Sequence, residues 1–243
     1  QVTVIVTDHK KAPQQGKNVT VKGDLGQSAA GKTDKNGELT VPEVEQTERH
    51  GVYIVGYTDG TFGPSRSMTR SEAAAIFARL LAEKNGDTIS TAANTKFADI
   101  PAHAWYSGYV KYLSNNGITY GKSKTIFAPN DAITRAEFTT MAVRFFDVYG
   151  SGDAEIMEQF SGFNDVSSGY WAAEYIKYAA LHGWINGYGD GSFHADREIN
   201  RAEVVTIVNR LLGREADEDY IADNLRKLNT FPDVSRKHWA YYA

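Results

Sequence analysis

An eleven-residue pattern occurs three times in this chain of 243 residues. It covers Phe62–Glu72, Phe127–Glu137 and Phe193–Glu203, and each copy ends in a Thr-Arg-x-Glu or Asn-Arg-x-Glu tetrad. The copies recur about 65 residues apart, and each leads into a segment with the apolar periodicity of a helix. Recurrence at a fixed period indicates tandem units that pack on one another, because a unit of this size cannot bury a core alone.

A second element combines an aspartate with a tryptophan six residues later. It precedes the pattern in copies two and three, stands alone at the C-terminus, and is missing before copy one. The three pairs are Asp99 with Trp105, Asp165 with Trp171, and Asp233 with Trp239. Since the C-terminal fragment supplies what copy one lacks, we expect a closed bundle of three units in which the Trp239 helix fills the gap.

The N-terminal part has a different periodicity, in which apolar residues alternate with polar ones up to about Tyr57. The expected strands are 2–6, 18–22, 39–41 and 52–55. This pattern predicts a small β-sandwich over residues 1–55, so the fold class is α+β with two kinds of domain. Asp34–Glu38 opens like an EF-hand calcium loop but lacks the terminal acidic ligand, and we expect a tight turn there.

Composition narrows the classes of function. With 26 basic and 30 acidic residues, the net charge of −4 gives no general attraction to nucleic acid or anionic lipid, so any anion must be met locally. The absence of cysteine excludes disulfides, thiolate metal sites and a cysteine nucleophile. No apolar run approaches the roughly 20 residues of a membrane helix, so no membrane insertion is expected. The chain begins at Gln1 without a signal-peptide pattern, and we expect it to be part of a longer protein.

The outer residues of each tetrad are explained by helix capping. In a capping box the first side chain accepts from the backbone N–H three residues later, and the glutamate returns to the N–H of the cap residue. The pairs are Thr69 with Glu72, Thr134 with Glu137, and Asn200 with Glu203.

The tetrad arginines are not explained by capping, because a cation at the first helical position opposes the helix dipole. Arg70, Arg135 and Arg201 nevertheless occupy that position in all three copies. Two interpretations are open. Each arginine pairs with a carboxylate of a neighbouring unit, or its guanidinium and free helix N–H groups converge on one carboxylate or phosphate of a ligand. Three copies would then give three anion sites.

Other recurring residues also have two interpretations. On sequence alone the tryptophans are better explained as core anchors, whereas at the edge of a groove they would stack on the apolar face of a sugar. The aspartates are interpreted as helix N-caps, with hydrogen bonding to ligand hydroxyls as the alternative. The loops Gly56–Gly60 and Gly187–Gly191 end in glycines that allow close approach of a ligand. Copy two has Gly121–Thr125 there, so its site is expected to be weaker or to differ in specificity.

From about Tyr53 to Ala243 the chain resembles the S-layer homology (SLH) family. The resemblance rests on GYTDGTF, FADI with Trp105, ITRAE, FNDV with Trp171, GYGDGSF, INRAE and FPDV with Trp239. It implies a mainly α, pseudo-threefold bundle whose grooves bind secondary cell wall polysaccharide, often through a pyruvylated amino sugar. Three tandem copies commonly anchor exported proteins to the walls of Gram-positive and some other bacteria.

The resemblance also implies boundaries and site residues. The first repeat is expected at 56–96 and lacks its first helix, and the other two are expected at 97–162 and 163–215. Residues 216–243 are expected to form a linker and the start of the helix that completes the bundle. The β domain at 1–55 looks immunoglobulin-like. The implied ligand-binding residues are Arg70, Arg135, Arg201, Trp105, Trp171, Trp239, Asp99, Asp165, Asp233, Gly60 and Gly191. Departures from the family pattern are Ser71, Asn200 and the loss of Tyr-x-Asp-Gly in copy two.

The leading hypothesis is therefore a non-catalytic anchor at the bacterial surface, with wall polysaccharide as partner and S-layer neighbours as a further partner. No nucleic acid, metal or cofactor is expected, because the sequence shows no metal-ligand cluster, serine elbow or phosphate loop. A glycosidase would need two carboxylates across a cleft, and the recurring acidic residues are already explained by capping. The alternatives are a protein–protein module within a surface lattice and the C-terminal anchor of a surface glycoside hydrolase.

Overall fold

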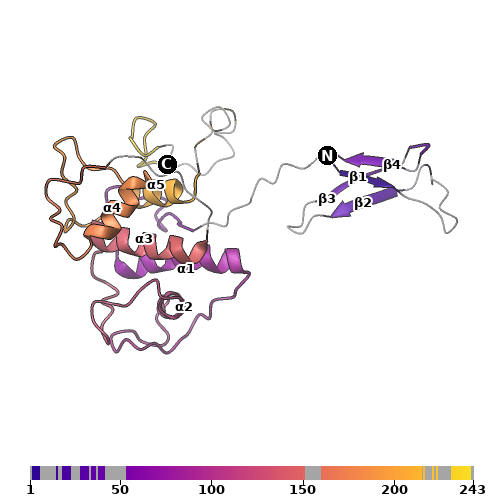
Figure 1. Cartoon of the computed structure of the whole chain (residues 1–243). Helices are drawn as coiled ribbons and strands as arrows, with labels where there is room; N and C mark the ends of the chain where they lie inside the picture. Colours follow the sequence, from indigo (N-terminus) through magenta and orange to yellow (C-terminus); the bar gives the residue numbers. More distant parts are fainter. Residues whose placement is uncertain are drawn as a thin grey trace. The chain divides into compact units, whose positions relative to one another are not determined.

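The chain divides into two compact units, Gln1–His50 and Gly51–Ala243 (Figure 1). The computed structural model describes residues 2–5, 15, 18–22, 28–32, 34–36, 38–41, 53–150, 160–214, 216, 221, 223 and 231–241. The smaller unit contains strands and the larger one contains helices, as the change of periodicity predicts.

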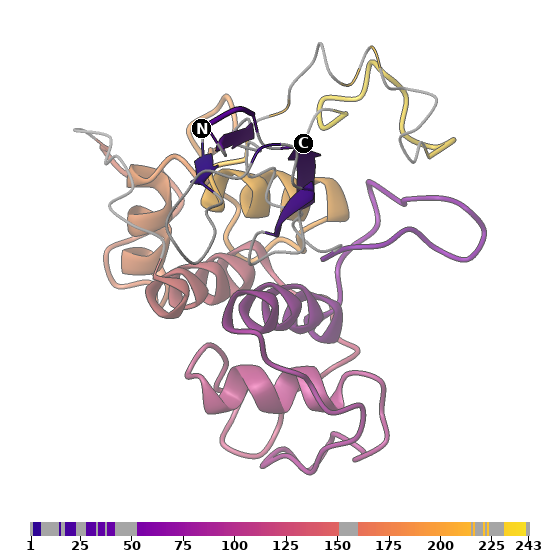
Figure 2. The ribbon, with the colours of Figure 1, turned by 90° about the vertical axis from the view of Figure 1, so that its right-hand side faces the viewer.

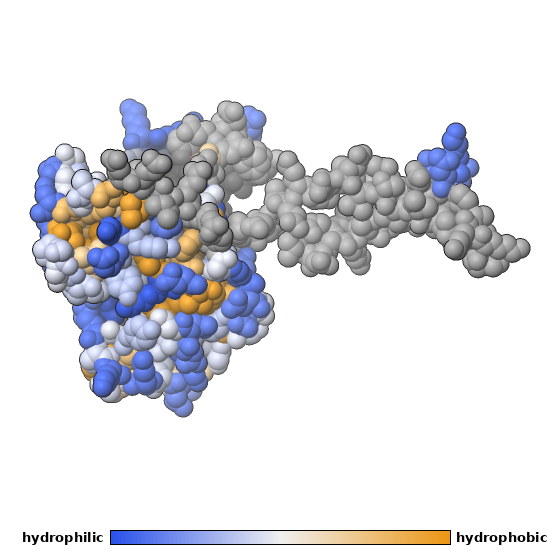
Figure 3. Space-filling model, viewed as in Figure 1, coloured by the Kyte–Doolittle hydropathy of each residue, from blue (hydrophilic) through white to orange (hydrophobic). Residues whose placement is uncertain are grey.

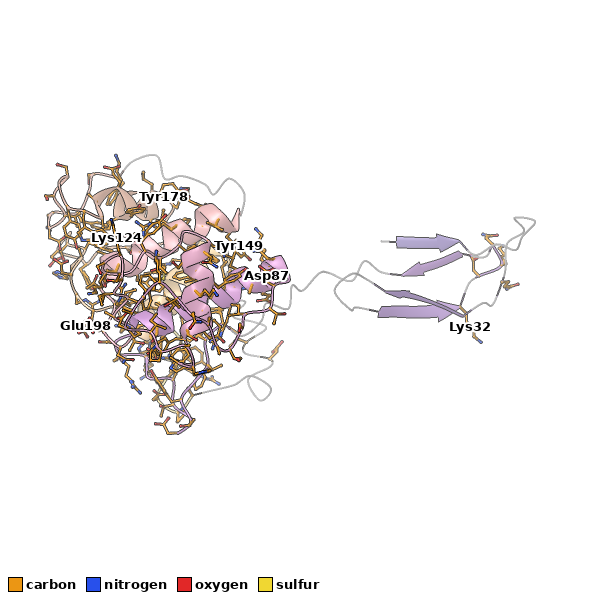
Figure 4. The ribbon with its side chains drawn as sticks, turned by 90° about the horizontal axis from the view of Figure 1, so that it is seen from below. Lys32, Asp87, Lys124, Tyr149, Tyr178 and Glu198 are labelled. Atoms are coloured by element: carbon orange, nitrogen blue, oxygen red, sulfur yellow. The ribbon has the colours of Figure 1, made fainter. Side chains whose placement is uncertain are left out.

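The described residues of the first unit include four strands, which form two antiparallel pairs (Figure 4). They are β1 (Val2–Ile5), β2 (Asn18–Lys22), β3 (Ser28–Lys32) and β4 (Glu38–Val41). β1 pairs with β4, with Val2 opposite Val41, and β2 pairs with β3, with Asn18 opposite Lys32. Strand β3 was not expected, because its sequence Ser-Ala-Ala-Gly-Lys has no β-branched or aromatic residue.

Two other expectations for the N-terminal region can be compared with the structure. Between β3 and β4, Lys35 and Asn36 form a turn in which the Asn36 N–H donates to the Asp34 carboxylate at 2.8 Å, so the predicted turn is confirmed. The strand expected at 52–55 is wrong for its described part, since residues 53–55 are not in a strand. Val6 and Val52 lie outside the described residues. The sandwich arrangement and the immunoglobulin-like identity stay predictions.

The second unit contains five helices among its described residues. They are α1 (Arg70–Asn85), α2 (Ser107–Asn115), α3 (Arg135–Tyr149), α4 (Ala173–Leu181) and α5 (Arg201–Leu211). The tetrad helices α1, α3 and α5 each begin at the arginine, whereas α2 and α4 follow the Asp–Trp pairs. Figure 2 shows α3 beside α1, and α1 also packs on α2 while α3 packs on α4 and α5. Among the described helices, none is both long and apolar enough to cross a bilayer.

The core lies between the tetrad helices, whose apolar stripes face one another. Phe77 of α1 packs against Phe138 and Phe145 of α3, with ring centroids 5.3 and 5.0 Å apart. All three rings have no exposed surface. The apolar periodicity after each tetrad therefore indicates the face of each helix that packs into the shared core of the unit.

Backbone hydrogen bonds join the three tetrads in a closed ring. The residue before the cap donates its N–H to the preceding copy each time: Met68 to Ile199 at 2.9 Å, Ile199 to Ile133 at 3.0 Å, and Ile133 to Met68 at 2.9 Å. The three side chains are fully buried. The three helix starts are thus arranged around one central point, so residues far apart in the sequence can form one site.

The C-terminal fragment makes the contacts that copy one would otherwise lack. The Asp233 carboxylate accepts from the N–H groups of Phe62 at 2.9 Å and Gly63 at 2.7 Å, and the Phe231 ring lies 5.3 Å from Phe62. Asp99 and Asp165 make the same pair of bonds within copies two and three. The helix expected at Trp239 is not present in residues 231–241, which form turns.

Candidate functional site

The three capping boxes are confirmed. Thr69, Thr134 and Asn200 have extended backbone angles, and each side chain accepts from the N–H of its glutamate at 3.2, 3.2 and 2.9 Å. The glutamates return to the cap N–H at 2.8, 3.1 and 3.0 Å. Local sequence is sufficient to fix these helix starts, because every partner lies within three residues.

The helix N–H groups that we expected to bind an anion are already occupied. The N–H of Arg70 donates to the Asp131 carbonyl and that of Ser71 to the Pro129 carbonyl, both at 3.0 Å, and the other two helices make equivalent bonds to the next copy. The third N–H is bound by the cap. The prediction of free helix N–H groups is therefore wrong, and an anion here would be met by side chains.

The tetrad arginines are held by the interface between copies. All three are at most 5% exposed. Each Nε donates to a phenylalanine carbonyl of the next copy: Arg70 to Phe127 at 2.7 Å, Arg135 to Phe193 at 2.8 Å, and Arg201 to Phe62 at 2.8 Å. Each guanidinium also lies within 5.0 Å of the centroid of that phenylalanine ring. These contacts explain a cation at a position that the helix dipole disfavours.

Two of the three arginines pair with the capping glutamate of the next copy. Arg70 Nη1 lies 3.1 Å from Glu137 Oε1, and Arg135 Nη1 lies 3.0 Å from Glu203 Oε1. The neighbour-pairing interpretation is thus confirmed for copies one and two. In copy three, no carboxylate of a described residue lies within 4.0 Å of the Arg201 guanidinium, whose Nη2 donates to the Val55 carbonyl at 2.7 Å.

The paired glutamates receive further donors. Glu203 Oε1 accepts from the Tyr188 hydroxyl at 3.1 Å and from Arg197, which also donates to that hydroxyl. Glu137 Oε1 lies 3.4 Å from Lys122. Burial lowers the pKa of the Arg135 guanidinium, whereas the charge of Glu203 acts in the opposite direction. Each of these two carboxylates is therefore held by two cations.

The three recurring tryptophans are exposed, so the core-anchor interpretation is wrong. Trp105, Trp171 and Trp239 have 55%, 57% and 65% of their surface accessible. Other exposed apolar residues include Val55 and Tyr120. Figure 3 shows hydrophobic and hydrophilic residues adjoining on one face of the helical unit. An indole ring in this setting can stack on a ligand.

One pocket of about 280 Å³ brings an arginine and a tryptophan together. Its lining is Arg135, Trp184, Ile185, Asn186, Gly187, Tyr188, Glu203, Thr206, Ile207, Arg210 and Trp239. Arg135 comes from copy two, the loop and α5 from copy three, and Trp239 from the C-terminal fragment. We call this the Arg135 site. The equivalent positions define the Arg201 site (Arg201, Tyr57, Glu72, Arg79, Trp105) and the Arg70 site (Arg70, Lys122, Glu137, Arg144, Trp171).

A second set of arginines in these sites was missed by sequence reasoning. Arg79, Arg144 and Arg210 each follow the tetrad glutamate by seven residues, so the repeat itself contained the signal. Arg79 donates to the Tyr53 carbonyl at 3.2 Å and lies over the Tyr109 ring at 5.1 Å. Arg144 bonds the Tyr175 hydroxyl at 3.1 Å.

The recurring aspartates and glycines shape loops. The aspartates bind loop N–H groups, and the caps of α2 and α4 are Tyr106 and Ala172, so the N-cap interpretation is wrong. The hydrogen bond from the Phe62 N–H, with that from Gly63, lowers the pKa of Asp233. Gly60 and Gly191 have φ of 83° and 80°, which favours glycine at these turns.

Comparison with known proteins assigns the repeats to a family. The family model of the S-layer homology domain matches residues 40–74, 96–139 and 162–205, together about half of the chain.

The chain is also similar to several curated proteins. It is 35% identical over 200 residues to Cell surface glycoprotein 1 and 31% identical over 216 residues to the Cellulosome-anchoring protein, both of Acetivibrio thermocellus, covering 79% and 88% of this chain. It is 32% identical over 163 residues, 65% of its length, to the Surface-layer 125 kDa protein of Lysinibacillus sphaericus. The chain spans 8%, 46% and 13% of these three relatives. With three matched copies of the repeat, the chain belongs to the S-layer homology domain family.

Proposed function

We propose that the helical unit is a non-catalytic module that binds an anionic wall polysaccharide and thereby holds a longer exported protein at the surface of a bacterium, most simply a Gram-positive one. The observation that carries this proposal is the combination of a buried tetrad arginine and an exposed tryptophan, which recurs at equivalent positions of the three sites and lines a pocket at one of them. A guanidinium recognises a carboxylate, and an indole ring stacks on a sugar, so the two together suit a carboxylated glycan.

The names of the relatives support a surface location, because they refer to a cell surface glycoprotein, an anchoring protein and a surface-layer protein. Within this proposal, the three exposed tryptophans contact successive sugars of one polymer. The aspartates and the glycines Gly60 and Gly191 hold the loops beside them rather than contacting the ligand. A pyruvylated amino sugar provides the carboxylate that the family resemblance implies.

Calorimetric titration tests this function directly. The probes are a 4,6-pyruvylated N-acetylmannosamine glycoside and the same glycoside without the ketal. Binding that requires the ketal carboxylate supports the proposal. A parallel pull-down with purified wall polymer, before and after removal of the ketal, extends the test to the polysaccharide. Retention that is indifferent to pyruvate would instead favour protein partners in a surface lattice, and no retention by either polymer would contradict the anchoring function.

A further inference from the structure

The three sites differ in whether a carboxylate is already present. In the Arg135 site, a single oxygen of Glu203 accepts from Arg135, Arg197 and the Tyr188 hydroxyl. Both guanidinium groups also lie over the Tyr188 ring, 5.2 and 5.5 Å from its centroid. This arrangement is an anion site that the chain fills with its own glutamate.

The Arg201 site repeats these donors, but its glutamate, Glu72, does not pair with them. Arg201 and Arg66 lie over the ring of Tyr57, 4.6 and 4.2 Å from its centroid, in the places of Arg135, Arg197 and Tyr188. Neither guanidinium has a carboxylate of a described residue within 4.0 Å. The equivalent Glu72 uses Oε2 for the bonds to both the N–H and the hydroxyl of Thr69.

Burial makes the missing counter-charge costly. Arg201 is 4% exposed, and its hydrogen bonds go to the neutral carbonyls of Phe62 and Val55. A buried charge without a counter-charge is destabilising, and two like charges on one ring add repulsion. Arg201 Nη1 has no partner among the described residues and is not one of the fully enclosed polar atoms. It is therefore available to a ligand.

The surroundings of Arg201 also suit a sugar. Val55, whose carbonyl accepts from Arg201, is 59% exposed. The adjoining backbone carbonyl of Tyr53 accepts from Arg79, which lies over Tyr109, and the Tyr109 ring is 6.3 Å from that of Trp105. The same short segment thus contacts Arg201 through Val55 and, through Tyr53 and Arg79, the aromatic pair Tyr109 and Trp105. The Arg70 site lacks this arrangement, because Lys122 and Asp131 replace the tyrosine and the second arginine.

We propose that the Arg201 site alone accepts a carboxylated sugar, and that Glu137 and Glu203 close the other two sites to carboxylates by taking the place of the ligand anion. This inference rests on the proposed function, and it names the site and the charge of the ligand. The other two tryptophans remain free to contact neutral sugars of the same polymer.

Paired variants at exposed arginines test the inference. Titration of the unmodified chain with the pyruvylated glycoside should give one ketal-dependent site per chain. Arg66→Gln should weaken binding by at least about tenfold, because a charge-assisted hydrogen bond is lost. The matched variant Arg197→Gln, at a position whose side chain is 41% exposed, should change affinity less than about twofold, since it acts on the closed site.

A gain-of-site variant completes the test. Glu203→Gln keeps the capping box, because glutamine also caps, and removes the internal anion. We expect the number of ketal-dependent sites per chain to rise from one to two. Three sites in the unmodified chain, equal losses in Arg66→Gln and Arg197→Gln, or an unchanged single site in Glu203→Gln would each overturn the inference while leaving the proposed function intact. No ketal-dependent binding by the unmodified chain would overturn both.

Discussion

The Arg135 and Arg201 sites contain the same set of hydrogen-bond donors, but these donors have different partners. Both place two guanidinium groups against a tyrosine ring, but only in the Arg135 site does a carboxylate of a described residue lie within 4.0 Å of them. The difference lies in the capping glutamate. Glu203 accepts from the cap N–H with Oε2 and from the arginines with Oε1, whereas Glu72 uses Oε2 for its bonds to the N–H and the hydroxyl of Thr69. A repeated motif therefore does not imply repeated function, because a small change in one side chain decides whether a site is filled internally.

The largest expected effect is on stability. Arg135→Ala leaves Glu203, whose side chain is 13% exposed, without its buried counter-charge, and should lower the free energy of unfolding by about 3 kcal/mol. Arg201→Ala removes a cation that has no carboxylate partner and should cost about 1 kcal/mol. Urea unfolding of both variants measures the difference. Equal losses would mean that the two arginines are in equivalent environments.

Next in size is the effect of alanine in the loops of the two sites. A Cβ at Gly187 would lie 2.5 Å from both the Phe163 ring and the Ser192 carbonyl, so Gly187→Ala should cost about 2 kcal/mol. A Cβ at Gly56 would lie 2.4 Å from the Phe231 ring. Gly56→Ala should lower the free energy of unfolding by about 1 kcal/mol, less than Gly187→Ala, because the C-terminal fragment can shift.

Gly189→Ala serves as the matched control for these loop variants, because nothing lies within 4 Å of the added Cβ. It should be nearly neutral when the three loop variants are compared by thermal unfolding. A larger loss for Gly56→Ala than for Gly187→Ala would show that the fragment is held as firmly as the internal repeats.

A smaller effect is expected on ligand affinity from the exposed tryptophans. Trp105→Ala should weaken binding of the pyruvylated glycoside by up to about tenfold, through loss of stacking. Trp239→Ala should have little effect on this monosaccharide, because its site is filled by Glu203. Both rings are more than half exposed, so neither change should disturb the fold. Titration of the two variants side by side measures the two losses of affinity. A larger loss in Trp239→Ala than in Trp105→Ala would place the carboxylate of the ligand in the Arg135 site.

The smallest effect concerns pH. Hydrogen bonds from the N–H groups of Phe62 and Gly63 lower the pKa of Asp233 in the folded state. The stability that the ionised carboxylate contributes is therefore complete above the usual pKa of about 3.9, and it is lost as pH falls through the lower folded-state pKa. The amide resonances of Phe62 and Gly63 should therefore shift below about pH 4. They should not titrate in Asp233→Asn. Titration of these amides at neutral pH in the unmodified chain would contradict this account.

Local features of this chain could be predicted from the sequence, and contacts between copies could not. The capping boxes and the starts of the tetrad helices were correct because every capping partner of Thr69 or Thr134 lies within one turn. The occupied helix N–H groups were missed because the acceptor for Arg70, the carbonyl of Asp131, lies in the next copy. The same reason applies to the carboxylate partners, since the spacing of a tetrad does not show which glutamate faces which arginine.

The tryptophans show a second limit of sequence reasoning. Periodicity places Trp105 and Trp171 among apolar residues, but it does not show which of these residues another copy covers. Both are exposed. By contrast, the arginines at Arg79, Arg144 and Arg210 recur at a fixed spacing and could have been found from the sequence. The strand at Ser28–Lys32 has no apolar alternation and depends on its pairing with β2.

The joint between the C-terminal fragment and copy one has a mechanical consequence. A pull on the chain before Phe62 and a pull on the chain after Asp233 both load the same short contact, in which the carboxylate bonds two N–H groups and Phe231 packs on Phe62. Tension from either direction therefore loads this contact, together with the bonds of Tyr53 to Asn209 and of Val55 to Arg201, before it reaches the central ring of backbone bonds. The contacts of the C-terminal fragment with copy one are therefore expected to open under tension before the sites around the ring lose their shape.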